Sequence, residues 1–119
     1  MNIESEKCFD VTITTKRYGY ENSWTLGTCT KGTDFENHQT YTESCCLNPG
    51  SYQLTCDDSY GDGWHGGFIE MEGKRYCENF ITGHKQVHTI HISLSAGNYF
   101  SQIRSRIKCY LYLFLLYHK

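Results

Sequence analysis

Several common sequence features are scarce or absent, and each absence narrows the possibilities. Proline occurs once in 119 residues, and no window shows the sustained periodicity of an amphipathic helix, so a helical domain is not expected. The chain has neither a Gly-x-Ser-x-Gly elbow nor a His-Glu-x-x-His pair, which excludes two common hydrolase signatures. A formal net charge of -2 gives no long-range attraction to nucleic acid or to an anionic membrane.

Cysteine, in contrast, is abundant, with seven residues in a short chain. This density is typical of a disulfide framework formed in an oxidising compartment. A zinc domain is the alternative, but it would need closely spaced Cys-x-x-Cys pairs, and the sequence has none. The adjacent Cys45 and Cys46 cannot easily bond each other, so each is expected to pair elsewhere, in a connectivity that the sequence does not fix. The six cysteines expected to form disulfides are Cys8, Cys29, Cys45, Cys46, Cys56 and Cys77.

The start of the chain does not show how it would reach such a compartment. Residues 1–8 have neither a basic n-region nor an apolar h-region, so no signal peptide is visible, and the sequence has no Asn-x-Ser/Thr acceptor for glycosylation. We therefore expect a mature or truncated piece of a secreted, extracellular protein. The alternative is that Met1 is not the natural start.

Alternation of apolar and polar residues is the dominant pattern along the chain. Phe9, Val11 and Ile13 alternate with Asp and Thr, which is typical of a half-buried strand. Residues 31–39 are polar and are predicted to form a loop. Short strands separated by turn residues favour an all-β fold, an antiparallel β-sandwich of jelly-roll-like type that is stapled by disulfides. The predicted strands span residues 8–15, 23–29, 40–46, 51–56, 68–71, 74–77 and 87–94.

This pattern divides the chain into three parts. Residues 1–7 form an N-terminal extension, residues 8–95 the β-sandwich domain, and residues 96–119 a tail of different character. The tail contains an apolar run at residues 109–117, which is shorter than the roughly 20 residues of a membrane span. It could be a buried last strand, the start of a truncated span, or non-native sequence. The last interpretation is preferred, with Cys109 as the odd cysteine.

Residues 56–67, CDDSYGDGWHGG, concentrate acidic residues and glycines in one loop. Calcium takes about 6–8 oxygen ligands, and glycines let a short loop bend so that carboxylates and carbonyls converge. Three carboxylates packed without a cation would repel one another, so the loop favours calcium, although its spacing is not that of an EF-hand. A purely structural turn is the alternative, because Asp and Gly are ordinary turn residues. The predicted metal ligands are Asp57, Asp58, Asp62 and Glu70.

Aromatic residues accompany the acidic loop. Tyr60, Trp64 and His65 could form a stacking surface for a sugar, and they are the predicted ligand-binding residues. Trp64 also has a commoner alternative, in which it packs into the core at one end of the sandwich. Glu21 and Asn22 precede a predicted strand and could brace the acidic loop or form a turn, and spacing alone does not decide between these.

Three motifs together resemble a family of secreted, cysteine-rich domains that often occur in tandem and have no established activity. The motifs are TITTKRYGYENSWTLG at residues 12–27, CCLNPGSY at residues 45–52 and DSYGDGW at residues 58–64. The resemblance covers residues 8–94 and implies a secreted, β-rich domain. Family members often carry Asp at the position of Lys16, and the tail after Ala96 has no counterpart in the family pattern.

The sequence therefore predicts an extracellular interaction, adhesion or matrix module that binds calcium and, through its aromatic residues, carbohydrate. The expected partner is an extracellular protein or a glycan, with no nucleic acid and no clear membrane span. Catalysis is not expected, because paired acids in a disulfide-bound loop are a poor match to two carboxylates facing each other across a cleft. A secreted hydrolase or its accessory domain, and a small secreted toxin or defence protein, are the alternatives.

Overall fold

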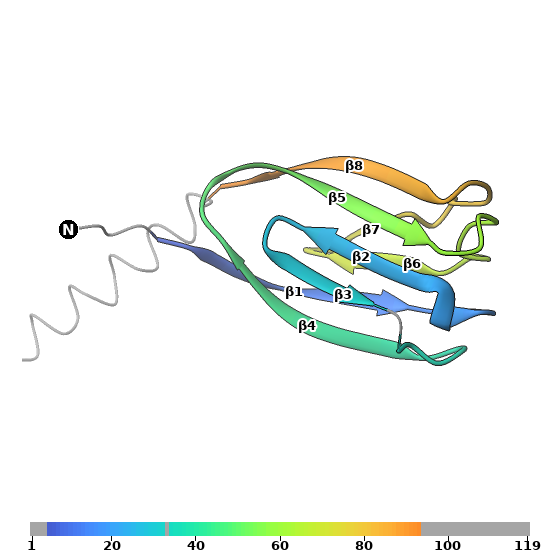
Figure 1. Ribbon diagram of the computed structural model, residues 1–119. Coiled ribbons are helices and arrows are strands. Elements are labelled where there is room, and N and C mark those ends of the chain that lie inside the picture. Colours follow the sequence, from blue (N-terminus) through green and yellow to red (C-terminus); the bar gives the residue numbers. More distant parts are fainter. Residues whose placement is uncertain (1–4, 33, 94–119) are drawn as a thin grey trace, which may run out of the picture.

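Two antiparallel four-stranded sheets pack face to face in the computed structural model, which describes residues 5–32 and 34–93 (Figure 1). The strand order is β4-β1-β6-β7 in the first sheet and β3-β2-β5-β8 in the second. A short 3-10 helix, η1 (Gly19–Glu21), precedes β2. The predicted all-β sandwich is confirmed, and the jelly-roll-like connectivity stays a prediction. The strands are β1 (Lys7–Thr14), β2 (Asn22–Leu26), β3 (Cys29–Gly32), β4 (Thr40–Leu47), β5 (Gly50–Asp58), β6 (Phe68–Met71), β7 (Lys74–Tyr76) and β8 (Lys85–Ile92).

The core lies between the two sheets and is formed by alternate residues of every strand except β3 and β7. In β1, the side chains of Phe9, Val11 and Ile13 are buried, while the residues between them face the outside of the sandwich. Burial of this apolar surface is the main force that holds the sheets together. The largest fully buried side chains are those of Trp24, Trp64 and Phe80.

Three disulfides hold the sandwich together and use all six cysteines predicted to pair: Cys8–Cys46, Cys29–Cys45 and Cys56–Cys77. The second and third connect the two sheets, because they join β3 to β4 and β5 to the residue after β7. The first lies within one sheet, between β1 and β4. Cys45 and Cys46 take different partners, as expected, because successive side chains of a strand point to opposite faces.

The main differences from the predicted strands lie in β2 and β3, in β5 and in β8, and the other strand ends agree to within one residue. The predicted strand at residues 23–29 is β2, a turn and the first residue of β3, which then extends into the segment predicted as a loop. β5 continues through Asp58, so Asp57 and Asp58 belong to a strand rather than to the following loop. β8 begins and ends two residues earlier than predicted. The predicted hairpin of β6 and β7 is confirmed, with Glu72 and Gly73 at positive φ in its turn.

The connections at one end of the sandwich position the candidate site. Three segments meet at the end of the molecule opposite the N-terminus, on the right in Figure 1: the β5–β6 loop, η1 and the C-terminal end of β1. The predicted tail at residues 96–119, with Cys109, lies outside the described residues. Within residues 5–32 and 34–93, no helix is long and apolar enough to cross a lipid bilayer.

Candidate cation site

The β5–β6 loop, residues 59–67, is held at the end of the sandwich by hydrogen bonds to two neighbouring segments. Ser59 N donates to Glu21 O over 3.0 Å, which joins the loop to η1. Gly83 N donates to Gly61 O over 3.0 Å, which joins it to the β7–β8 connection. Glu21 therefore braces the acidic loop, which was one of the two roles that the sequence left open for it.

Asp58 organises the loop from within. Its side chain is buried, and its Oδ2 accepts hydrogen bonds from the backbone N–H groups of Gly61, Asp62 and Gly63 over 2.9, 2.6 and 2.7 Å. Oδ1 accepts a longer bond from Tyr60 N, over 3.3 Å. Burial opposes ionisation of Asp58, but the backbone hydrogen bonds, first that from Asp62, outweigh it and lower the pKa of the carboxyl group. Asp58 is thus a charged anchor for four loop amides.

Two glycines make this wrapping possible. Gly61 and Gly63 have φ of 100° and 82°, values that side-chain-bearing residues rarely adopt. A Cβ at Gly63 would also collide with the carbonyl oxygen of Phe80, so the loop could not approach the β7–β8 connection as closely. The glycine density in the sequence therefore reflects the backbone path around Asp58.

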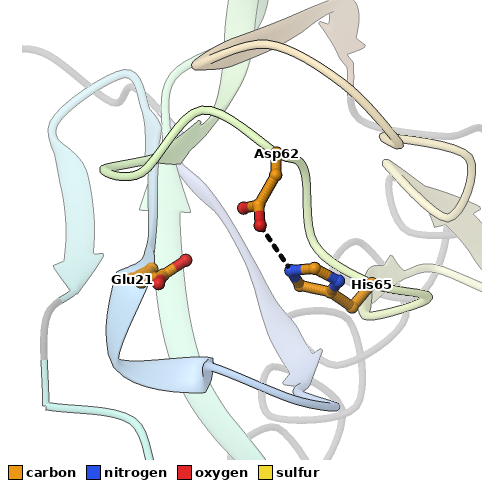
Figure 2. A group of neighbouring side chains, drawn as sticks. All are labelled: Glu21, Asp62 and His65. Carbon is orange, nitrogen blue, oxygen red and sulfur yellow. Dashed lines mark ion pairs between the residues drawn. The ribbon is translucent and has the colours of Figure 1, made fainter.

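Beside this anchor, Glu21, Asp62 and His65 form a second group, in which one potential ligand atom from each residue lies within 4.8 Å of the others. Glu21 extends from the end of η1 toward Asp62 and His65, which both belong to the β5–β6 loop (Figure 2). His65 Nε2 lies 3.3 Å from Asp62 Oδ2. Asp58 also lies close enough for its negative charge to act on the carboxyl group of Glu21. Below, the acidic cluster means Glu21, Asp58 and Asp62.

The electrostatics of the acidic cluster are unfavourable in the protein alone. Burial, followed by the negative charges of Asp58 and Asp62, raises the pKa of Glu21, and the nearby His65 only partly opposes this effect. The ionised form of Glu21 therefore has a free-energy cost in the fold at neutral pH. A bound cation would remove that cost.

Four buried side-chain atoms near this point make no hydrogen bond: Glu21 Oε2, Asp62 Oδ1, and both Oδ1 and Nδ2 of Asn22. Asn22 is 0% exposed, and it lies directly opposite Asp58 in the β2–β5 ladder, on the same inner face. Buried polar atoms are almost always paired, because an unpaired one costs about 1–3 kcal/mol. Three of these four atoms are oxygens, which are the ligands of a hard cation.

The structure separates the four predicted metal ligands. Asp58 and Asp62 lie in the acidic cluster, but Asp57 and Glu70 do not. Asp57 follows the buried Cys56 in β5 and therefore faces the outer surface of the second sheet. Glu70 lies between the buried residues of β6 and faces the outer surface of the first sheet. A single ion therefore cannot join all four, and grouping them was an error that strand alternation explains.

The three predicted ligand-binding residues also differ in their placement. Trp64 is 0% exposed, packs against Phe80 with ring centroids 6.1 Å apart, and donates from Nε1 to the backbone oxygen of Asp57 over 2.9 Å. Its core packing is confirmed, so its ring cannot stack on a sugar, and that prediction is corrected. Tyr60 and His65 are exposed and lie beside the acidic cluster.

Sequence reasoning missed two aromatic residues of this region, Tyr18 and Tyr20, and left Glu21 and Asn22 undecided. The last two lie within the motif at residues 12–27, as part of its ENSW segment, and that motif was the available signal. Comparisons with protein-family models, curated proteins and solved structures find no match for the chain. The resemblance to secreted cysteine-rich domains therefore stays a prediction, and the chemistry of the cluster rests on its own geometry.

Proposed function

We propose that the protein is an extracellular interaction module that binds one calcium ion at the acidic cluster. Glu21 and Asp62 supply the main carboxylate ligands, and Asn22 supplies an amide oxygen from the buried side. Asp58 holds the loop in shape, and its negative charge adds to the attraction for the ion.

The observation that carries this proposal is the set of buried oxygens without a hydrogen-bond donor: Glu21 Oε2, Asp62 Oδ1 and Asn22 Oδ1. A carboxylate oxygen removed from water needs a donor or a cation, because desolvation otherwise makes it costly. A single ion among these atoms would satisfy them together and would relieve the repulsion that raises the pKa of Glu21.

The donor set favours calcium over zinc and magnesium. Three of the four unpaired atoms are oxygens, while the imidazole Nε2 of His65, which zinc would use, already faces Asp62 Oδ2 at 3.3 Å. Magnesium needs near-octahedral geometry at about 2.1 Å, which a cluster drawn from two separate segments does not readily supply. Calcium accepts irregular sets of oxygens at about 2.3–2.6 Å.

An extracellular location agrees with the disulfides. A domain of this size with three disulfides is typical of secreted proteins, because cytosolic thiols are kept reduced. Calcium is also abundant outside cells, and extracellular modules bind it with dissociation constants of about 10⁻⁴–10⁻³ M. The disulfides and the cation would then stabilise the same small core.

The test is thermal unfolding in calcium and in EGTA, together with terbium luminescence excited through the nearby aromatic residues. Calcium at a hundredfold excess over its dissociation constant should stabilise the fold by about 2.7 kcal/mol, or roughly 10–20 °C in melting temperature. Asp62→Asn should abolish the shift and the luminescence. His65→Asn should leave calcium binding largely intact, whereas a zinc site would be lost.

Two matched controls come from the chain itself. Asp57→Asn and Glu70→Gln remove the same charge from the outer faces of the two sheets, so the calcium shift should persist in both. Loss of the shift in either control, or an unchanged shift in Asp62→Asn, would show that the ion binds elsewhere. No shift in the wild type would refute the proposal.

A further inference from the structure

A pocket of about 540 Å³ opens beside the acidic cluster. Three tyrosines line it, Tyr18, Tyr20 and Tyr60, and their exposed fractions are 43%, 57% and 73%. Glu21 and Asp62, the two proposed carboxylate ligands of calcium, line it as well. In the described part of the chain, the only other large apolar or aromatic side chains this exposed are Ile81 and Val87. The exposed aromatic surface is therefore concentrated at the mouth of the proposed cation site.

Contacts with the site hold one of these rings in place. Tyr18 packs edge-to-face against Tyr20, with centroids 6.3 Å apart, and against His65, with centroids 5.2 Å apart. Tyr18 and His65 both have a left-handed backbone, with φ of 59° and 54°, which is uncommon for residues other than glycine. Strained residues of this kind concentrate at binding and active sites, and here the two strained residues contact each other.

The charge of the site limits what can complete the coordination of the ion. The acidic cluster has three carboxylates, and calcium has two positive charges, so a formal charge of about −1 remains. An acidic ligand would add to this excess, and none of the described residues lining the pocket is a lysine or arginine that could offset it. Neutral oxygens, such as hydroxyl groups, are therefore the best remaining ligands for an ion that takes about 6–8 of them.

From this arrangement we infer that the pocket binds a neutral carbohydrate, and this inference rests on the proposed calcium site. Two neighbouring hydroxyl groups of a sugar complete the coordination of the ion, and the apolar face of the sugar ring packs on Tyr60. Tyrosine suits this role because it offers a large apolar face and a polar tip. Tyr60 replaces Trp64 as the stacking residue, since Trp64 is buried.

The experiment measures retention of the disulfide-bonded protein on agarose that carries mannose, galactose, fucose or N-acetylglucosamine. Each matrix is run in about 1 mM calcium and in EGTA. The wild type should be retained on at least one matrix in calcium and released by EGTA. Tyr60→Ala should weaken binding about tenfold on that matrix. Tyr60→Phe keeps the ring, so its affinity should stay closer to that of the wild type.

Val87→Ala is the matched control, because Val87 is as exposed as Tyr18 but lies on β8, away from the pocket. Its retention should equal that of the wild type. A calcium-dependent rise in melting temperature without retention on any matrix overturns the carbohydrate inference and leaves the calcium site in place. Retention that survives EGTA, or that is unchanged in Tyr60→Ala, overturns it as well. Absence of the melting shift refutes the calcium site itself.

Discussion

Asp58→Asn separates the structural role of the acidic loop from its binding role. The native carboxylate accepts three hydrogen bonds at Oδ2, over 2.9, 2.6 and 2.7 Å, and one at Oδ1, over 3.3 Å. An asparagine has one carbonyl oxygen, which would take the place of Oδ2 and keep the three shorter bonds as neutral ones. Its NH₂ group would then face the N–H of Tyr60, so that two donors meet.

The expected loss follows from these four contacts. A hydrogen bond to a charged group contributes about 1.5–3 kcal/mol and a neutral one about 0.5–1.5 kcal/mol, so three weakened bonds cost about 3 kcal/mol. The facing donors at Tyr60 add about 1 kcal/mol. Relief of the repulsion between Asp58 and Glu21 offsets part of this loss. The net destabilisation should be about 2–4 kcal/mol, a large share of the 5–15 kcal/mol typical of a domain.

Urea unfolding in EGTA at pH 7, followed by the fluorescence of the buried Trp24 and Trp64, measures this loss. With a slope of about 2 kcal/mol per molar urea, the midpoint should fall by roughly 1–2 M. Asp57→Asn is the same substitution one residue earlier, on the outer face of β5, and should stay within about 0.5 kcal/mol of the wild type. If the two variants proved equally stable, Asp58 would not be the anchor of the loop.

Two further predictions concern stability without calcium. Glu21→Gln should be more stable than the wild type at pH 7 in EGTA. The raised pKa means that ionised Glu21 destabilises the folded state. The stability difference between variant and wild type should disappear below the ordinary pKa of 4.5, where Glu21 is protonated in both the folded and the unfolded state. Identical urea midpoints at pH 7 would contradict this prediction. Replacing both Cys29 and Cys45 with alanine should lower the free energy of unfolding by about 3 kcal/mol, because that disulfide closes a loop with a sequence separation of 16 residues. A loss of less than about 1 kcal/mol in urea unfolding would contradict this prediction.

The sequence was sufficient to predict most of the sandwich because one face of each long strand is buried. The alternation in β1 and β5 corresponds directly to the buried residues of those strands. β3 was missed because it is a short edge strand paired only with β2, and none of its four residues is fully buried. With no buried face, it has no apolar alternation for sequence analysis to detect. The disulfide pairing was equally hidden, since it depends on which strands become neighbours.

The candidate site was predicted in part. Composition identified the β5–β6 loop, because Asp and Gly gather where the backbone turns tightly, and that is a property of the local sequence. It could not show that Asp57 and Asp58 point to opposite sides, since that depends on β5 extending past Cys56. It also could not bring Glu21 to Asp62, because these residues are distant in the sequence and meet only through the pairing of β2 with β5.

The proposal gives the two roles that the sequence left open, tight turn and metal site, to different carboxylates. Asp58 is saturated with backbone donors, and so it behaves as the Asp of a tight turn. Glu21 and Asp62 each keep a buried oxygen that no donor satisfies, which a turn would not require. The turn is also what holds Asp62 near Glu21, because Asp62 donates its own N–H to Asp58. A cation site here would therefore depend on the turn. Replacing Asp58, the anchor of the loop, should weaken ion binding even though the ligands Glu21 and Asp62 remain.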